Sequence, residues 1–435
     1  MADIRAFRGF RYDLGRVGAL SDVVAPPYDV IDPALQERLY HQSPYNAIRL
    51  ELTRAEPTDT DPSQKYARAA LTLREWLADN ILRQDTARSL YVYEQEYTIE
   101  GQTWIRRGFM ARVRLEPFGT GKVFPHEQTL SGPKEDRWKL LNATGFNISP
   151  IFGLYPDPQG DIFRLLEPHI RTAPPLVARD HLGVSHRLWL VTDSATISQV
   201  VGAMGPQPVY IADGHHRYET GLRYLHERRA AGEVLDDEAP ANFCLMMLVG
   251  MSDPGLLILP THRLVSGLTA PLTAAQLEAL LAPHFDIVER TGTNPHAAWE
   301  YIQMDGQQST LGFGTVADGQ WLVAKLRDGR IMAELAPEHS PAWRSLGVSI
   351  LHQLVLDRLI PPCAGGPVKC QYVHLMSEVT DAVSQRACQL ACLVPPATMQ
   401  HVAQIAGQGE KMPPKSTYFY PKLVTGLVFN SLKKD

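Results

Sequence analysis

Long apolar runs and an excess of charge of one sign are both missing from this chain of 435 residues. No stretch of roughly 18 or more consecutive apolar residues occurs, so we expect no membrane-spanning helix. The opening MADIRAFRGFRYDLG lacks the apolar centre of a signal peptide. A formal net charge of −5 provides no global basic field for DNA or RNA. These absences predict a cytoplasmic protein whose partners include neither nucleic acid nor membrane.

Cysteine is scarce, and a Walker-type phosphate loop is absent. The five cysteines show no C-x-x-C spacing, so we expect reduced thiols and no zinc site. None of them occurs between residues 1 and 243. The sequence GTGKVF at 119–124 has a lysine but lacks the glycine spacing of a P-loop. If the chain binds phosphate, another motif must do so.

Apolar patterning indicates strands and helices that are mixed along the chain. A helix is expected at DPALQERLYHQ, where Asp32 is the N-cap and Pro33 occupies the first position. A β-hairpin is expected over 89–115, with its turn at Glu100-Gly101. Two buried strands are expected in ANFCLMMLVGM and GLLILPTHRLV. Because strands and helices do not alternate regularly, the pattern predicts an α+β fold class in preference to a doubly wound sheet.

One loop indicates the domain organisation. AAGEVLDDEAP, residues 230–240, is acidic and rich in small residues, which is typical of a boundary. We therefore predict a phosphate- or nucleotide-binding domain at 1–235 and an α+β C-terminal domain at 236–435 that completes the cleft. Within the second domain, strands are expected near 310–333 and an amphipathic helix is expected in RSLGVSILHQLVLDRLI.

The stretch VYIADGHHRYETGLRYL, residues 209–225, concentrates phosphate binders and proton carriers on one turn. A buried strand leads to Gly214, which permits a backbone turn that a side chain would block, and a helix follows to about residue 229. A helix N-terminus offers free N–H groups and a positive dipole end to an anion. Arg217 adds a guanidinium that can donate two hydrogen bonds to a phosphate. His215 and His216 can donate hydrogen bonds or move protons. We interpret Gly214–Arg217 as a phosphate or nucleotide site.

Two other interpretations stay open for this turn. In the first, Asp213 caps the helix, and the histidines and Arg217 are surface polar residues. In the second, Asp213, His215 and His216 bind a metal, although adjacent histidines on a helix point in different directions. Asp213 is also a candidate catalytic group.

A second dense polar cluster is PHEQTLSGPKEDRW, residues 125–138. His126 and Glu127 are suited to take a proton from a substrate hydroxyl, with Glu127 as the preferred base and Asp136 in reserve. The donors suited to phosphate oxygens are Thr129, Ser131, Lys134 and Arg137. A magnesium ion that bridges phosphates needs a carboxylate, for which Glu127, Asp136 and Asp213 are the candidates. The alternative is a solvated loop with a helix cap.

Two shorter segments add candidate substrate-binding residues. VAPPYDVI presents Tyr28 and Asp29 at the end of a rigid Pro-Pro turn, either as a structural turn or as a pocket wall. LPTHRLV places His262 and Arg263 after an apolar strand, where they either bind an anionic group or serve the structure.

The tail segment MPPKSTYFYPKLVTGL interleaves basic and aromatic residues. Lys415 and Lys422 are suited to a phosphate or a substrate carboxylate, and Ser416 and Thr417 lie between them. A terminal strand that ties the domains together is the alternative. Basic and aromatic residues together can also mean nucleic acid, but the acidic chain disfavours that interpretation.

ADGHHRYETGL, residues 212–222, resembles the strand–turn–helix motif of the ParB/sulfiredoxin superfamily, in which a Gly-x-x-Arg at the helix start binds nucleotide phosphates. Here the matching residues are Gly214 to Arg217. The whole chain also resembles the uncharacterised DUF 1015 family. That second resemblance rests on segments 23–31, 125–141, 149–155, 212–220, 259–265 and 412–428. It implies a ParB/sulfiredoxin-like mixed-sheet core with an additional α+β C-terminal domain.

The resemblance also bears on activity. The absence of cysteine before residue 244 argues against sulfiredoxin chemistry, and the acidic chain without a helix-turn-helix pattern argues against a ParB partition protein. The free-serine kinases of the superfamily share an Asp-Gly-His-His-Arg motif. They imply an enzyme, a small-molecule kinase with an alcohol acceptor, with a nucleotide or pyrophosphate as donor and Mg²⁺ as cofactor. The alternative is a nucleotide-binding regulatory protein with slow hydrolysis, and either protein could form a homodimer.

Overall fold

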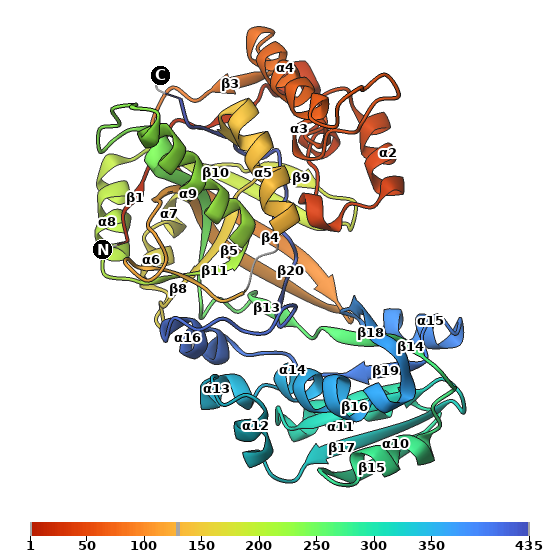
Figure 1. Ribbon diagram of the computed structural model, residues 1–435. Coiled ribbons are helices and arrows are strands. Elements are labelled where there is room, and N and C mark those ends of the chain that lie inside the picture. Colours follow the sequence, from red (N-terminus) through yellow and green to blue (C-terminus); the bar gives the residue numbers. More distant parts are fainter. Residues whose placement is uncertain (1, 128–130, 434–435) are drawn as a thin grey trace. The chain divides into compact units, whose positions relative to one another are not determined.

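The computed structural model describes residues 2–127 and 131–433, and it divides into two compact units (Figure 1). Unit 1 comprises Met1–Pro125, Thr129–Leu257 and Pro421–Asp435. Unit 2 comprises His126–Gln128 and Ile258–Tyr420. Both units mix sheet and helix, so the α+β fold class is confirmed.

A nine-stranded mixed sheet forms the centre of unit 1, in the order β6-β11-β8-β12-β5-β4-β10-β9 with β1 paired to β5. The β11–β6 and β12–β8 pairs are parallel, and the remaining pairs are antiparallel. Its strands are β1 Ile4–Arg5, β4 Leu90–Ile99, β5 Gln102–Arg114, β6 Val123–Pro125, β8 Ile151–Tyr155, β9 Leu176–Arg179, β10 Ser185–Val191, β11 Val209–Asp213 and β12 Phe243–Gly250. The predicted hairpin is confirmed as β4–β5, because Glu100 and Gly101 adopt the positive φ values that a tight hairpin turn needs.

Helices cover this sheet, and two short strand pairs flank it. The pairs are β2 Phe10–Tyr12 with β3 Leu82–Gln84, and β7 Phe146–Asn147 with β21 Asn430–Ser431. The helices are α1 Leu14–Val17, η1 Leu20–Asp22, η2 Tyr28–Val30, α2 Pro33–Gln42, α3 Ile48–Glu51, α4 Gln64–Ala78, α5 Ser131–Thr144, α6 Asp161–Arg164, α7 Glu167–Thr172, α8 Ser194–Met204, α9 His215–Ala230 and η3 Pro240–Asn242. The predicted helix α2 is confirmed, since the Asp32 side chain accepts a hydrogen bond from the Leu35 N–H.

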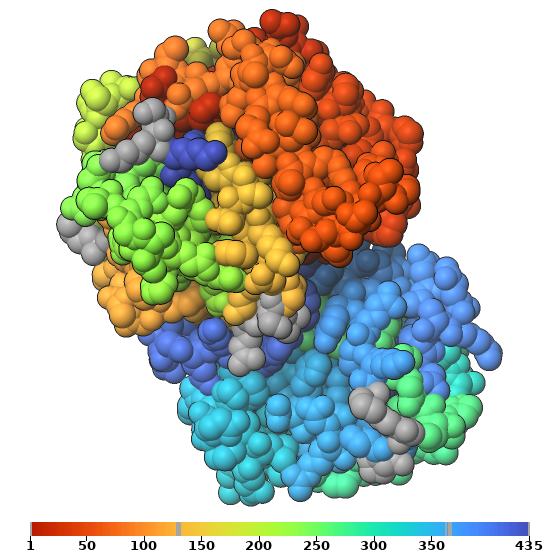
Figure 2. All heavy atoms as spheres, turned by 45° about the horizontal axis from the view of Figure 1, so that its top comes forward, coloured from red at the N-terminus to blue at the C-terminus, as the bar shows by residue number. Residues whose placement is uncertain are grey.

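The core of unit 1 lies between the sheet and its helices. Val200 and Met204 of α8 and Tyr218 of α9 pack with buried side chains of β5, β11 and β12. A smaller cluster holds Leu432 beside α5 and α9, through Leu141 and Tyr224. Figure 2 shows a deep-blue segment of the C-terminal region between green α9 and yellow α5. The C-terminal segment is therefore built into unit 1.

Unit 2 contains a six-stranded sheet in the order β15-β17-β16-β19-β14-β18. Its strands, with two short ones, are β13 Leu257–Leu259, β14 His262–Leu268, β15 Phe285–Gly292, β16 Thr310–Thr315, β17 Gln320–Leu326, β18 Ala364–Val373, β19 Leu390–Leu393 and β20 Tyr418–Tyr420. Its helices are α10 Ala274–Leu281, α11 Pro295–Asp305, α12 Arg330–Leu335, α13 Pro341–Arg344, α14 Gly347–Ile350, η4 Leu351–Leu359, η5 Pro361–Cys363, α15 Met376–Ser384 and α16 Met399–Gly407.

Three expectations for unit 2 need correction. The single strand expected in GLLILPTHRLV is two strands, β13 and β14, separated at Pro260, which cannot donate a ladder hydrogen bond. The strands expected near 310–333 end at Leu326, and α12 follows. The helix expected in RSLGVSILHQLVLDRLI begins at Gly347 and continues from Leu351 as a π-helical segment.

The compact units divide the chain elsewhere than the predicted boundary at 235/236. Strand β12 follows that boundary, yet it pairs between β5 and β8 near the middle of the unit 1 sheet. The C-terminal segment also returns to unit 1, where the Arg112 Nε donates a hydrogen bond of 2.6 Å to the Asn430 Oδ1. A loop composition cannot report such long-range pairing. Among the described residues, every helix is too short or too polar to cross a membrane.

Candidate functional site

The turn between β11 and α9 has the local structure that the sequence predicts. Residues 209–212 of β11 are buried, Gly214 adopts a φ of 91°, and α9 begins at His215. A Cβ atom at Gly214 would lie 3.0 Å from both the Nε and the Nη2 of Arg217. The arginine side chain therefore folds back against the turn, and a glycine is needed both for the φ angle and for that close approach.

The interpretation of Asp213 as a helix cap is wrong. The N-cap of α9 is Gly214, and no side chain of the described residues forms a cap hydrogen bond there. The Asp213 carboxylate lies between two cations, at 2.9 Å from the Arg217 Nη2 and 2.8 Å from the Lys422 Nζ. Although burial alone would raise it, the charges of Lys422 and Arg217 hold the pKa of Asp213 well below its usual range. The carboxylate is thus ionised and doubly paired.

Arg217 connects the turn with the strand beside it. Its Nη1 donates to the Pro150 carbonyl, and its Nη2 binds Asp213. Its Nε is buried and has no hydrogen-bond partner within residues 2–127 and 131–433. A guanidinium presents donors in a fixed fork, so this unpartnered edge is available to an acceptor.

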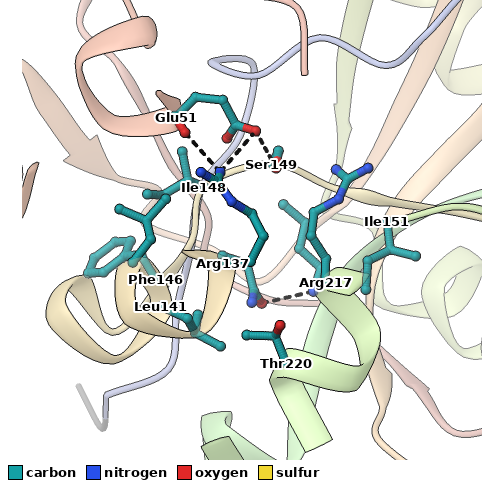
Figure 3. A pocket seen from close by; sticks show the side chains of 12 residues that line it. Glu51, Arg137, Leu141, Phe146, Ile148, Ser149, Ile151, Arg217 and Thr220 are labelled. Atoms are coloured by element: carbon teal, nitrogen blue, oxygen red, sulfur yellow. Dashed lines mark hydrogen bonds and ion pairs between the residues drawn. The ribbon is translucent and has the colours of Figure 1, made fainter. Parts of the chain in front are cut away.

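Arg137 of α5 and Glu51 of α3 form a buried ion pair beside this turn (Figure 3). The Arg137 Nη1 lies 2.8 Å from the Glu51 carbonyl oxygen and 3.6 Å from its Oε1. The Glu51 Oε1 also accepts from the Ser149 hydroxyl at 3.4 Å and from the Tyr28 N–H at 3.3 Å. Glu51 is 1% exposed, so this carboxylate joins three separate segments inside the protein.

Asp136 is occupied on both oxygens. Its Oδ1 accepts from the Lys65 ammonium at 2.8 Å and from the Tyr66 hydroxyl at 2.7 Å. Its Oδ2 accepts from the Arg137 Nε at 2.9 Å. Against the effect of burial, the Arg137 charge and these donors hold the pKa of Asp136 well below its usual range. The carboxylate therefore ties α4 to α5.

Tyr28 packs against the same arginine. The Arg137 guanidinium lies 4.2 Å from the centre of the Tyr28 ring, a cation–π distance. Burial raises the pKa of Tyr28 to about 12, against the opposing charge of Arg217. Asp29 follows on the exposed side of η2. The Pro-Pro loop therefore lies close to both site arginines.

A small cavity lies among α3, α5, α9 and β8, with a volume of about 40 Å³. Figure 3 shows Arg137 and Glu51 on one side, Arg217 on the other, and Thr220 of α9 below them. Such a volume holds a few water molecules or one small functional group, but not a nucleotide. Its polar lining residues are Glu51, Arg137, Asn147, Ser149, Arg217 and Thr220.

Sequence reasoning missed Arg106, which is fully buried on β5. Its guanidinium contacts the Gln95 Oε1 and the Pro421 carbonyl, and it lies 4.6 Å from the Phe152 ring centre. The Gln95 Nε2 donates in turn to the Lys422 carbonyl at 3.1 Å. These bonds fix the backbone that carries Lys422. The available signal was an arginine on the same strand face as the buried Met110.

Glu51 and Thr220 were also missed. Glu51 stands between Leu50 and Leu52, and a carboxylate flanked by two leucines is a detectable signal. Lys134, by contrast, was predicted as a hydrogen-bond donor to phosphate oxygens. It forms an ion pair of 2.6 Å with Glu219 of α9. Arg223 and Glu135 form a second pair between these helices at 2.7 Å. This polar contact holds α5 beside α9.

Other predicted residues belong to unit 2. The His126 Nε2 lies 2.8 Å from the Thr417 Oγ1, and the Glu127 Oε1 accepts from the Lys415 N–H at 3.0 Å. Lys415 has a φ of 59° and an exposed side chain. The Ser416 hydroxyl donates to the Pro413 carbonyl at 2.6 Å. The segment around Glu127 thus holds the 412–417 loop.

Arg263 and His262 are buried in unit 2. The Arg263 Nη2 donates to the Lys415 carbonyl at 3.0 Å, and its Nε donates to the His352 Nε2 at 3.1 Å. Burial, with the nearby Arg263 charge, lowers the pKa of His262 to about 3.

The predicted site residues fall into two groups, one in each compact unit. The group in unit 1 is Tyr28, Asp29, Lys134, Asp136, Arg137 and Asp213–Arg217, and the group in unit 2 is His126, Glu127, His262, Arg263 and Lys415–Thr417. Thr129 lies outside the described residues.

The predicted magnesium ligands do not form a site together. Among the described residues, no group of three His, Cys, Asp or Glu side chains is arranged to hold a metal. Asp213 is paired with Arg217 and Lys422, while Asp136 is paired with Lys65 and Arg137. Carboxylates neutralised by cations are poor ligands for a hard cation. The side chains described in unit 1 therefore do not fit a resident metal.

Comparison with known proteins identifies a family model. The model described as "Protein of unknown function (DUF1015)" matches residues 4–349. No curated protein matches.

Solved structures with a similar chain path are distant. A free serine kinase in complex with AMP is 12% identical, with 72% of this chain and 88% of that chain covered and a TM-score of 0.34. A conserved hypothetical protein from Pyrococcus furiosus is 13% identical, with 72% and 92% covered and a TM-score of 0.34. SbnI with C-terminal truncation from Staphylococcus aureus is 12% identical, with 75% and 90% covered and a TM-score of 0.35.

Proposed function

The chain belongs to the DUF1015 family, and from its site we propose that it binds a phosphate-bearing ligand at the β11–α9 turn and transfers a phosphoryl group to a small hydroxyl compound. One observation carries the proposal. The first turn of the 16-residue helix α9 has no side-chain cap from the described residues, and Arg217 and Lys422 both converge on Asp213 beside it. The N-terminal end of a helix dipole and two cations close to it are what an anion needs.

The charges support phosphate in particular. Arg217 is held by Asp213 and the Pro150 carbonyl, so its position is fixed before a ligand binds. The backbone that carries Lys422 is held by the side chains of Gln95 and Arg106, which donate to the carbonyls of Lys422 and Pro421 respectively. Phosphoryl transfer is catalysed mainly by positioning and by stabilising charge on the transferred group. Two preorganised cations at a helix N-terminus supply both.

Several features of this proposal come from the sequence resemblance. We take the donor to be a nucleotide or pyrophosphate and the acceptor to be a serine-like alcohol. Mg²⁺ would enter with the donor phosphates, since Asp213 and Asp136 of unit 1 are already paired. A cytoplasmic location and a homodimer stay predictions, as does Glu127 as the base.

Isothermal titration calorimetry with ATP, ADP, AMP and pyrophosphate tests the anion site. Arg217→Ala removes a charged donor, and a charge-assisted hydrogen bond worth about 2 kcal/mol implies binding weaker by about 30-fold. Arg223→Ala is the matched control, because Arg223 lies on the same helix in exposed ion pairs with Glu135 and Glu227. We expect the control to change affinity by less than about twofold. Equal affinities of wild type and Arg217→Ala for every ligand would contradict the site.

A further inference from the structure

Three buried polar atoms without a hydrogen-bond partner in the described part of the chain belong to side chains that line one cavity. They are the Glu51 Oε2, the Arg217 Nε and the Thr220 Oγ1, and their side chains all line the small cavity beside the β11–α9 turn (Figure 3). Glu51 is 1% exposed and Thr220 is 4% exposed. Buried polar groups are nearly always paired, so three unpaired ones at a single cavity indicate that something occupies it.

The chemistry of these atoms selects the occupant. The carboxylate oxygen of Glu51 accepts, the Nε–H of Arg217 donates, and the Thr220 hydroxyl can do either. A phosphate or carboxylate group would face the negative charge of Glu51. An ammonium group could not accept from Arg217. A hydroxyl group both donates and accepts, and a volume of about 40 Å³ admits a hydroxyl or hydroxymethyl group or water.

We propose that this cavity binds the hydroxyl of the phosphoryl acceptor and that the Glu51 Oε2 takes its proton. The proposal rests on the proposed function. The hydroxyl oxygen forms a bond to the terminal phosphorus of the nucleotide or pyrophosphate, and its proton goes to the Glu51 Oε2. The bond from that phosphorus to its bridging oxygen breaks, and the leaving phosphate keeps the electron pair.

Arg217 links the acceptor cavity to the anion site. Its Nη2 binds Asp213 at the start of α9, while its Nε is the unpartnered donor at the cavity. The Arg217 guanidinium therefore borders both the anion site and the cavity. A group that contacts the transferred phosphoryl group and the attacking oxygen needs such a position.

Glu51 fits the role of base better than its neighbours do. Asp136 and Asp213 have both carboxylate oxygens bonded to cations or to a hydroxyl. The Glu51 Oε1 is engaged by Tyr28 and Ser149, which orients the carboxylate, while the described residues leave the Oε2 unpartnered. We therefore propose Glu51 as the base, whereas the sequence predicts Glu127, and the Gln variants of the two residues decide between them.

The test uses water as the smallest acceptor. Water in the cavity should be activated, so the full chain should hydrolyse ATP slowly in Mg²⁺ buffer. We expect Glu51→Gln to slow hydrolysis by about 100-fold, in the range for loss of a general base, with the ATP Kd within about threefold of wild type. Thr220→Val should slow it by about tenfold, and Thr220→Ser should recover most of that loss. Circular dichroism checks the fold of each variant, and Thr220→Val carries the test if Glu51→Gln does not fold.

Three outcomes overturn the proposal. The first is a Glu51→Gln variant whose ATP Kd and rate of ATP hydrolysis are both within about threefold of wild type. The second is hydrolysis lost in Glu127→Gln and retained in Glu51→Gln, which assigns the base to unit 2. The third is wild type that binds ATP but neither hydrolyses it nor transfers phosphate to L-serine, with L-alanine as the hydroxyl-free control. Failure of the proposed function is distinct, because wild type then binds neither ATP nor pyrophosphate.

Discussion

At the scale of single residues, Gly214 and Arg217 depend on each other. The glycine has a φ of 91°, and the space its missing Cβ would fill is bordered by the arginine guanidinium at 3.0 Å. The carboxylate of Asp213 then holds the guanidinium at 2.9 Å. The site is thus formed by backbone geometry as much as by charge.

We predict that Gly214→Ala lowers the free energy of unfolding by about 1–3 kcal/mol, since the substitution forces a side chain into a left-handed backbone and against Arg217. Phosphate-ligand affinity should fall with it. Gly202→Ala is the matched control: Gly202 lies in α8, and a Cβ there meets no described atom within 4 Å. That variant should be more stable by about 0.5–1 kcal/mol. Urea denaturation measures both, and a Gly214→Ala protein as stable as wild type would contradict the account.

Asp253, in the turn after β12, should make stability depend on pH near neutrality. Burial raises the pKa of Asp253 to about 6, although the carboxylate accepts from the Gly255 N–H at 3.0 Å. The folded protein binds the Asp253 proton more tightly than the unfolded protein does, so protonation of Asp253 stabilises the fold. This contribution to the free energy of unfolding is full below about pH 3.8 and is lost as pH rises through about 6.

Asp253→Asn should therefore be more stable than wild type by about 1–3 kcal/mol at pH 8, and the gain should shrink towards about pH 4.5. Urea denaturation of both proteins at the two pH values measures this. An equal difference at both pH values would show that ionisation of Asp253 is not the cause.

At the scale of elements, local signals predicted several structures well. The Asp32 cap of α2, the Glu100-Gly101 hairpin and the strand–Gly214–helix unit each depend on neighbours in sequence, so their residues report them directly. The turn at Gly214, for which we propose phosphate binding, was for the same reason visible as a motif.

What the sequence could not show depends on long-range pairing. Arg106 and Arg112 lie on one face of β5, and both bind the C-terminal segment, at Pro421 and Asn430. No local pattern tells which distant backbone accepts from a buried arginine. Likewise, the partners of Glu51 come from three segments that only folding brings together.

At the scale of the whole molecule, the two units should differ in their response to acid. In unit 2, burial lowers the pKa of His262 to about 3 and that of His352 to about 4. Both rings accept hydrogen bonds, from the Val394 N–H and the Arg263 Nε respectively, so both must be neutral. Their stabilisation is full above about pH 6.5 and is lost as pH falls towards these values, by about 2 kcal/mol for each ring at pH 5.

Hydrogen exchange by mass spectrometry, corrected for intrinsic rates, compares the units at about pH 7.5 and pH 5. We expect β14 and β19 of unit 2 to lose more protection than β11 and β12 of unit 1, where the pKa shift of Asp253 acts in the opposite direction. Equal loss of protection in the two sets of strands would contradict this prediction.

The central claim is that a phosphate group binds at the start of α9. A crystal structure of the protein grown with ADP tests it most directly. The account predicts a phosphate against the N–H groups of His215–Arg217, with the Arg217 guanidinium and the Lys422 ammonium in contact with its oxygens. An ADP phosphate bound away from this turn, or crystals without ADP at saturating concentration, would contradict it.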